Sequence, residues 1–236
     1  MPDIVWIDIP AGTVQLEDVE TSFAVAPFAI AQYPLTWLQF QCFVDAADGY
    51  CEVRGWHGMP ERARRTEPRR AQWEFANHPR DTVDWYEATA FCRWLSAKTQ
   101  QQIRLPSEME WQQAATGGQP HNVYPWGEQY ESGRANCNEI SAQDGPLYLQ
   151  RTSAVGLYPS GRSRHAVHDL AGSVWEWCSN RYDEPLDSAV HETALRVVRG
   201  GSWDSLPRGV RSANRGRGGS GVASGNLGFR LARTIF

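Results

Sequence analysis

The residues best suited to binding chemistry lie together near the end of the chain, between Arg199 and Arg233. The stretch opens with Gly-Gly-Ser-Trp and continues through small and polar residues that include Arg208, Arg211, Arg215 and Arg217. A guanidinium offers a planar fork of N–H donors, so these arginines can hold carbonyls and carboxylates and keep an irregular segment rigid. We expect Trp203 and Phe229 to anchor its two ends in the core. The stretch therefore predicts a compact surface segment built to display side chains.

Other reactive residue types in the chain have simpler interpretations. Glu176 stands between two tryptophans, which indicates a buried structural carboxylate hydrogen-bonded to the backbone. Asp81 and Asp84 precede a predicted helix and are typical of caps rather than of acid–base catalysis. His165 and His168 could share a helix face, but no third residue follows at a spacing typical of a metal site.

Composition excludes several classes of function. The 236 residues carry a net charge of −4, which argues against a nucleic-acid surface, although arginines at 62–70 predict a solvated basic loop. The five cysteines form no Cys-x-x-Cys pair, so neither a zinc ribbon nor a dense disulfide framework is expected. Neither a signal peptide nor a membrane-spanning run is found, and we expect a cytoplasmic protein with no membrane contact. Eleven tryptophans are expected to pin irregular segments to the core, with sugar-binding platforms as the alternative.

The elements that must position these residues predict an α+β domain. Short strands are expected within residues 4–30, and helices at 36–46 with Thr36 as N-cap, at 84–98, and from 107 to about 117. Ser107 and Glu110 form a capping box, and Gly117-Gly118 ends the third helix. Further strands are predicted at 154–158, 173–178, 195–200 and 228–232. We expect the last two to pair in a small closing sheet.

Five short motifs occur in order along the chain. They are Arg-Leu-Pro-Ser-Glu-Met-Glu-Trp at 104–111, Tyr-Pro-Trp-Gly at 124–127, His-Asp-Leu-Ala-Gly-Ser-Val-Trp-Glu-Trp at 168–177, Arg-Gly-Gly-Ser-Trp at 199–203 and Leu-Gly-Phe-Arg at 227–230. Together they resemble the formylglycine-generating-enzyme/sulfatase-modifying-factor domain, a variant of the C-type lectin fold. The resemblance covers nearly the whole chain. It implies one domain over residues 1–236, with two or three helices, small antiparallel sheets and extensive ordered loops.

The resemblance also implies what catalysis would need. Formylglycine-generating enzymes use two cysteines a few residues after the Gly-Gly-Ser-aromatic motif, whereas residues 203–215 here contain none. Without thiolates there is no soft-ligand site for copper(I). Related iron oxygenases take their ligands mainly from an additional domain with a His-x-x-x-His-x-Glu motif, which this sequence lacks. We therefore expect no enzymatic activity and neither copper nor iron. The alternative is an enzyme or regulator of this family with a non-Cys site.

Calcium is the metal that the resemblance supports. The family often holds Ca²⁺ in loops with an Asn, a downstream Asp and backbone carbonyls, and Asn136 and Asp144 match this pattern. A second family site normally starts with Asn where this chain has Ser173, which puts that site in doubt. The alternative at each of these residues is an Asx-turn.

The C-terminal segment, residues 199–233, further resembles the variable region of diversity-generating retroelement proteins, in which this fold is a display scaffold. In those systems randomised Asn codons never yield Lys, Glu, Gln, Met or Trp, and none of these types occurs between Asp204 and Asn226. Ser220, Gly221 and Ala223 depart from the Pro, Asp and Arg that are frequent there. The expected framework is 200–203, 207–208, 211–215, 217 and 227–230. The expected ligand-binding surface consists of Trp203, Asp204, Ser205, Leu206, Gly209, Val210, Gly216, Gly218, Gly219, Val222, Ser224, Gly225 and Asn226.

The resulting hypothesis is a non-enzymatic binding protein whose ligand, expected to be a protein or other macromolecule, meets the surface of residues 203–226. Such domains can form the recognition end of a longer multidomain chain. An ordinary Gly-rich loop, with function elsewhere, is the alternative. Carbohydrate binding is less favoured, because lectin motifs such as Glu-Pro-Asn are absent and Glu184-Pro185 is followed by Leu186.

Overall fold

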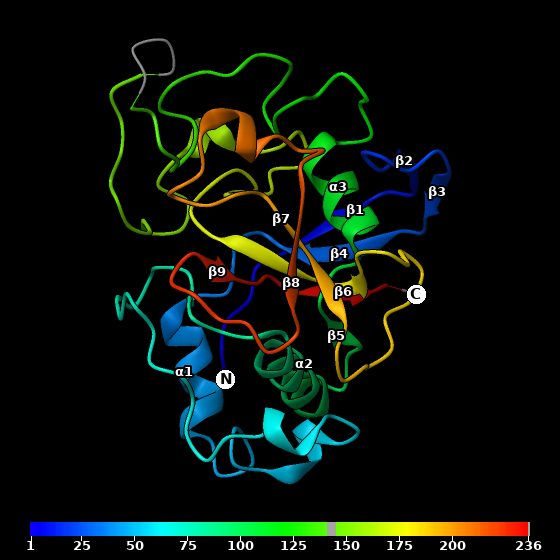
Figure 1. The fold of residues 1–236 in the computed structure, drawn as a ribbon, viewed down its shortest axis with the longest axis vertical. Coiled ribbons are helices and arrows are strands. Elements are labelled where there is room, and N and C mark those ends of the chain that lie inside the picture. The colour runs from blue at the N-terminus through cyan, green and yellow to red at the C-terminus, as the bar shows by residue number, and fades with distance from the viewer. Residues whose placement is uncertain (141–144, 236) are drawn as a thin grey trace.

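The computed structural model describes residues 1–140 and 145–235, which form three helices and ten strands joined by long loops (Figure 1). The helices are α1 (Trp37–Asp45), α2 (Trp85–Thr99) and α3 (Glu108–Thr116). The strands are β1 (Trp6–Ile9), β2 (Gly12–Gln15), β3 (Ser22–Val25), β4 (Phe28–Ala31), β5 (Ile103–Arg104), β6 (Trp175–Arg181), β7 (Leu195–Arg199), β8 (Arg215–Gly219), β9 (Leu227–Gly228) and β10 (Ala232–Thr234). The predicted α+β class with small sheets is confirmed.

Local sequence signals account for all three helices. Thr36, Asp84 and Ser107 are the N-caps of α1, α2 and α3, and each helix has a complete capping box. Gly117 ends α3 in the left-handed conformation, at φ 63°, where a residue without a Cβ carries no steric cost. These helix predictions are confirmed to within one or two residues.

The strands form two four-stranded sheets and one hairpin. Their orders are β1-β4-β10-β5, β8-β7-β6-β9 and β2-β3. All pairs are antiparallel except β6 with β9, which run parallel. The predicted pairing of 195–200 with 228–232 is wrong, because β6 lies between β7 and β9. After β9 the chain buries Phe229 and Arg230 and enters the other sheet as β10.

Strand β6 is buried on both faces, and this divides the core into two parts. Trp177 belongs to the apolar cluster around α1 and α2, whereas Cys178, the next residue, packs into the cluster beside α3. Figure 1 shows the β6–β9 sheet between α2 below and α3 above. Phe229 completes the first cluster, with its ring centroid 5.7 Å from that of Phe91. The C-terminal segment is therefore tied to the core that both helices share.

Two other predictions are wrong. Residues 154–158 form turns instead of a strand. Within the basic loop, Arg69 is not solvated: its guanidinium lies 2.6 Å from Asp84 and 2.8 Å from Glu87, and its side chain is only 18% exposed.

Of the helices in the part of the chain that the structure describes, none has the length and apolar character needed to cross a membrane.

Candidate functional site

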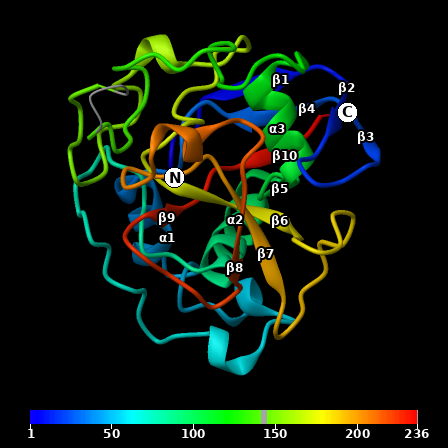
Figure 2. The same ribbon diagram turned by 45° about the horizontal axis from the view of Figure 1, so that its top comes forward.

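The C-terminal segment lies on the surface as a loop, a strand and a second loop. After β7 it passes through a 3-10 turn at Pro207–Val210, forms β8, and returns to β9. In Figures 1 and 2 this orange-to-red path stays on the side of the molecule that faces the viewer. Strand β8 was not anticipated; it pairs with β7 from Leu195↔Gly219 to Arg199↔Arg215 and forms the edge of its sheet.

A buried ion pair holds the middle of the segment. Arg215 donates to both carboxylate oxygens of Glu108, from Nε at 2.7 Å and from Nη2 at 2.8 Å. Burial alone would lower the pKa of Arg215, but the hydrogen bonds and charge of Glu108 outweigh burial and raise it. Arg199 is also fully buried, with its Nη1 3.7 Å from Glu108, and burial lowers its pKa. Glu108 opens α3, where the helix dipole favours a carboxylate.

A second buried pair holds the end of the segment. Arg230 donates to Glu176 from Nε at 2.5 Å and from Nη2 at 2.6 Å, and Trp111 donates to the same carboxylate at 2.7 Å. Arg230 also donates to the carbonyl oxygens of Ala31 and His168. Glu176 is buried as predicted, but its partners are side chains and not backbone groups.

The arginines that were expected to brace the segment divide into two kinds. Arg211 reaches Glu17 at 3.1 Å and, like Arg215, joins the segment to the N-terminal part of the chain. Arg208 and Arg217 are exposed, and no ion pair of either is found among the described residues. Arg217 instead lies over the ring of Tyr182, at 5.0 Å from its centroid. The bracing prediction is confirmed for two of the four.

Main-chain hydrogen bonds fix the two loops from outside the segment. Carbonyl oxygens of Ser205, Ser224 and Asn226 accept from the backbone N–H groups of Asn138, Thr82 and Trp175, respectively, at 2.8–3.0 Å. Because these donors come from three separate parts of the chain, the backbone of each loop is held while its side chains remain available.

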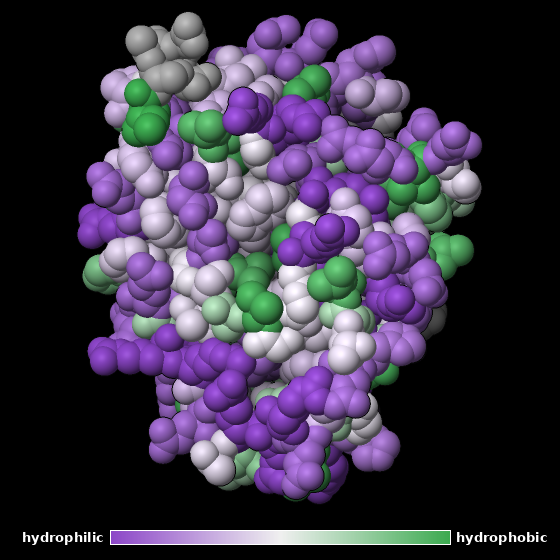
Figure 3. Space-filling view, viewed as in Figure 1, coloured by the Kyte–Doolittle hydropathy of each residue, from purple (hydrophilic) through white to green (hydrophobic). Residues whose placement is uncertain are grey.

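Exposed side chains cover the outer surface of the segment. Asp204, Leu206 and Val222 are exposed, and Leu206 and Val222 retain 38% and 50% of their accessible area. Asp204 accepts from Asn226 Nδ2 at 3.1 Å, which joins the two loops. In Figure 3 the middle of this face is mostly pale, with only small green groups. The surface therefore mixes polar, charged and apolar side chains and is not broadly hydrophobic.

Trp203 lies at the edge of this surface and does not anchor the core as predicted. It is half-buried, its indole N–H donates to Gly225 O at 3.3 Å, and its ring is stacked with Tyr148 at 6.5 Å. Phe229, by contrast, is fully buried as expected.

Three residues of the predicted ligand-binding surface have structural roles instead. Val210 is 0% exposed and packs with Tyr124 and Ala171, so its side chain does not reach a ligand. A Cβ at Gly216 would lie 2.8 Å from Val198 Cγ2, and one at Gly218 would lie 2.8 Å from the ring of Trp177. The remaining predicted positions, Trp203, Asp204, Ser205, Leu206, Gly209, Gly219, Val222, Ser224, Gly225 and Asn226, are at least partly accessible.

The proposed calcium ligands can be placed only in part. Asn136 Nδ2 donates to Arg151 O at 3.0 Å, while Asn136 Oδ1 is buried and has no hydrogen-bond partner among the residues that the structure describes. An oxygen left free in this way fits the hard-ligand set of Ca²⁺. Asp144 lies outside the described residues. Ser173 has φ 64°, a conformation that Asn adopts more readily, and its N–H donates to Asn136 O. Calcium binding stays a prediction.

None of the five cysteines belongs to the C-terminal segment, although Cys137 packs in the same apolar cluster as Val210 and Cys92 in the same cluster as Phe229. Among the described residues no disulfide joins any two of the cysteines, and burial raises the pKa of Cys92 and of Cys178. Raised pKa values keep both protonated, which makes them poor nucleophiles and poor metal ligands.

The roles of Glu108 and Arg199 could not be predicted from the sequence, because a buried pair formed across the chain leaves no local spacing signal.

Comparison with known families identifies the domain. A model described as "Sulfatase-modifying factor enzyme 1-like domain" matches residues 2–235. An inactive C-alpha-formylglycine-generating enzyme 2 from Bos taurus is 30% identical over 277 residues, covering 96% of this chain and 87% of the relative. The formylglycine-generating enzyme of Streptomyces coelicolor is 37% identical over 209 residues, covering 79% and 61%.

Some relatives are much longer than this chain. The serine/threonine-protein kinase Pkn1 of Chlamydia trachomatis is 35% identical over 171 residues, which is 68% of this chain and a quarter of the kinase. Among solved structures, CarF has a TM-score of 0.72 at 21% identity, with 99% of both chains covered. Treponema denticola variable protein 1 has a TM-score of 0.70 at 21% identity, covering 97% of this chain and 94% of that one. These likenesses show the shared fold.

Proposed function

The chain belongs to the family of sulfatase-modifying factor enzyme 1-like domains, and we propose that it is a non-enzymatic member that binds a macromolecule through the outer surface of residues 203–226. The observation that carries this proposal is the contrast between a backbone held by buried ion pairs and side chains that remain exposed. Glu108 and Glu176 hold the frame, while Asp204, Leu206 and Val222 reach solvent. Rigid backbone with exchangeable side chains is also how antibody paratopes work.

The chemistry of the segment supports binding over catalysis. Residues 199–233 contain no cysteine, so the thiol pair of formylglycine-generating enzymes has no counterpart there. The exposed side chains are chemically mixed and include an acid, two arginines and two aliphatic residues, which suits recognition of a protein surface with modest affinity. The Treponema protein of the same fold is named a variable protein, which motivates extending the proposal to diversification of these positions. A cytoplasmic location and a place in a longer multidomain chain are part of the same proposal.

Two matched libraries test the display role. One randomises Asp204, Leu206 and Val222, and the other randomises Val210, Arg215 and Phe229 with the same codons. We expect most members of the first library to resist proteolysis like the parent protein, and few of the second, because surface changes usually alter stability little. Equal survival in the two libraries would contradict the display role.

Diversification is tested separately on the DNA. We expect a near-copy of the sequence encoding residues 203–230 close to the gene, with mismatches confined to adenines of the copy, and a neighbouring reverse transcriptase. Without that copy the segment is a fixed binding surface and not a diversified one.

The identity to the Streptomyces enzyme supports a second candidate, an enzyme that uses a non-Cys site. Purified protein, supplied with a Cys-containing peptide, oxygen and copper, decides between the two. Formation of formylglycine would show that the protein is an enzyme and would contradict the binding proposal. We expect no formylglycine.

A further inference from the structure

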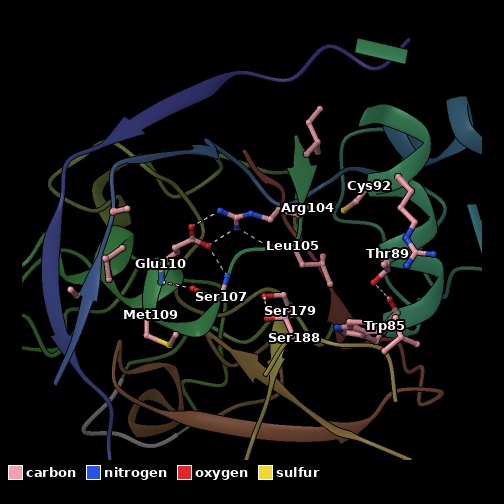
Figure 4. Close-up of a pocket in the computed structure, with 16 residues that line it drawn as sticks. Trp85, Thr89, Cys92, Arg104, Leu105, Ser107, Met109, Glu110, Ser179 and Ser188 are labelled. Carbon is pink, nitrogen blue, oxygen red and sulfur yellow. Dashed lines mark hydrogen bonds and ion pairs between the residues drawn. The ribbon is translucent and has the colours of Figure 1, made fainter. Parts of the chain in front are cut away.

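A pocket with no established role lies away from the C-terminal segment. It has a volume of about 440 Å³, and none of its lining residues belongs to 199–233. This size is typical of small-molecule sites. Figure 4 shows side chains of α2 on one side and the Arg104–Glu110 pair on the other, with Ser179 and Ser188 between them.

Most polar groups around the pocket already have partners within the protein. Arg104 and Glu110 form a two-point ion pair with both distances at 2.6 Å. Thr89 Oγ1 donates to the carbonyl of Trp85, and Ser107 caps α3. The rest of the wall is largely apolar and includes Val25, Leu105, Met109 and Val190. A ligand body in this pocket must therefore be apolar, because few polar groups remain to receive it.

One charge in the lining is not balanced. Arg104 and Glu110 cancel each other, which leaves Arg93 as the only other charged side chain in the lining among the residues that the structure describes. Arg93 Nη1 donates to the carbonyls of Gly55 and His57 at 3.1 and 2.7 Å, and these acceptors are neutral. Within residues 1–140 and 145–235 Arg93 makes no ion pair, and its Nε and Nη2 have no hydrogen-bond partner. The pocket thus combines apolar walls with a single uncompensated guanidinium.

From this charge balance we propose that the pocket binds a small apolar molecule carrying one carboxylate, with the carboxylate on Arg93 and the apolar body between α2 and the start of α3. A carboxylate accepts hydrogen bonds from a guanidinium and neutralises it, which a neutral or cationic head group does not do. The site is independent of the surface proposed above for macromolecular binding.

The test uses octanoate, octanol and octylamine, which share a chain length and differ in head-group charge. Calorimetric titration of the full chain is expected to give octanoate at least about tenfold tighter than octanol, the effect of one charge-assisted hydrogen bond, with no binding of octylamine. Arg93→Gln should reduce octanoate affinity to that of octanol. Arg54→Gln removes an exposed positive charge that does not line the pocket and is expected to change it less than about twofold.

Val190→Trp fills the pocket from its rim and is expected to abolish binding of both octanoate and octanol. Arg93→Lys keeps the charge and should retain part of the preference for octanoate, which guards against a variant that merely misfolds. Thermal melts establish that each variant is folded before titration. No octanoate binding to the native protein, equal affinity for octanoate and octanol, or binding that survives Val190→Trp would each overturn the proposal.

Discussion

Arg215 and Glu108 stand 107 residues apart in sequence and form a two-point hydrogen-bonded ion pair, with Glu108 fully buried and Arg215 6% exposed. Through this pair the edge strand β8 is fastened to the first turn of α3. The same carboxylate lies 3.7 Å from Arg199, so one buried acid serves two strands of the sheet. The Arg215–Glu108 pair therefore also helps to fix the position of the exposed loops on either side of β8.

Removing Arg215 should therefore be costly. Arg215→Met removes the two-point hydrogen bond to buried Glu108 and leaves it only the longer 3.7 Å contact with Arg199 as counter-charge, and we expect a loss of about 3–5 kcal/mol in the free energy of unfolding. Arg217→Met, two residues along the same strand but exposed, loses only the contact with the ring of Tyr182 and should cost less than about 1 kcal/mol. Urea unfolding of the two variants measures the difference. Similar losses in both would show that the pair does not hold the segment.

Two valines of the segment offer a matched test of which positions face solvent. Val210 is fully buried, whereas Val222 is half exposed. Val210→Asp places an unpaired carboxylate in the core and should prevent folding or cost more than about 4 kcal/mol. Val222→Asp should leave stability within about 0.5 kcal/mol. Circular dichroism and chemical denaturation measure the folding and stability of both variants. A Val210→Asp protein as stable as the native one would show that the Val210 side chain is not buried.

Gly218 and Gly221 offer a second matched test, one in a crowded and the other in an open position. A Cβ at Gly218 would lie 2.8 Å from the ring of Trp177, while a Cβ at Gly221 would meet nothing within 4 Å. Gly218→Ala is expected to destabilise by about 1–3 kcal/mol through overpacking. Gly221→Ala should be neutral or slightly stabilising, because it restricts the unfolded chain. Thermal unfolding measures both, and equal melting temperatures would argue against the close contact.

Stability should depend on pH through Asp169. Burial raises the pKa of Asp169 to about 6, against about 3.9 for an ordinary aspartate. Between these values the folded state binds more protons than the unfolded chain, so stability falls as pH rises from about 4 to 6 and then levels off. Asp84 shifts in the same direction, because it too is buried.

Asp169→Asn isolates this contribution, since it keeps an oxygen that can accept from the N–H of Gly156. Relative to the native protein, the free energy of unfolding of the variant should rise by about 2–3 kcal/mol as the pH increases from 4 to 7. Urea unfolding at several pH values measures the gain. A difference that stays constant across this range would contradict the assignment.

Calcium should stabilise the fold if Asn136 is a ligand. At a concentration about 100-fold above its Kd, Ca²⁺ should add about 2.7 kcal/mol to the free energy of unfolding. Magnesium at the same concentration should add less, because the smaller ion demands a stricter geometry. Melting curves with CaCl₂, MgCl₂ and EDTA measure the effect, and Asn136→Ala should remove it. A calcium response that persists in this variant would place the ion elsewhere.

The sequence by itself determined the features that depend on near neighbours. The capping boxes begun by Thr36, Asp84 and Ser107, and the stop at Gly117, involve contacts within about four residues, which a linear pattern displays directly. The motif order was sufficient for the fold class, and Phe229 was correctly placed in the core.

Only the tertiary structure decided which residues of the C-terminal segment are frame and which are surface. Val210 and Val222 are the same residue type in similar local sequence, yet one packs under Tyr124 and the other faces solvent. The insertion of β6 between β7 and β9, and the choice of Glu108 as the partner of Arg215, likewise depend on segments that meet only after folding. Such contacts are set by packing across the whole domain, and no spacing within the segment encodes them.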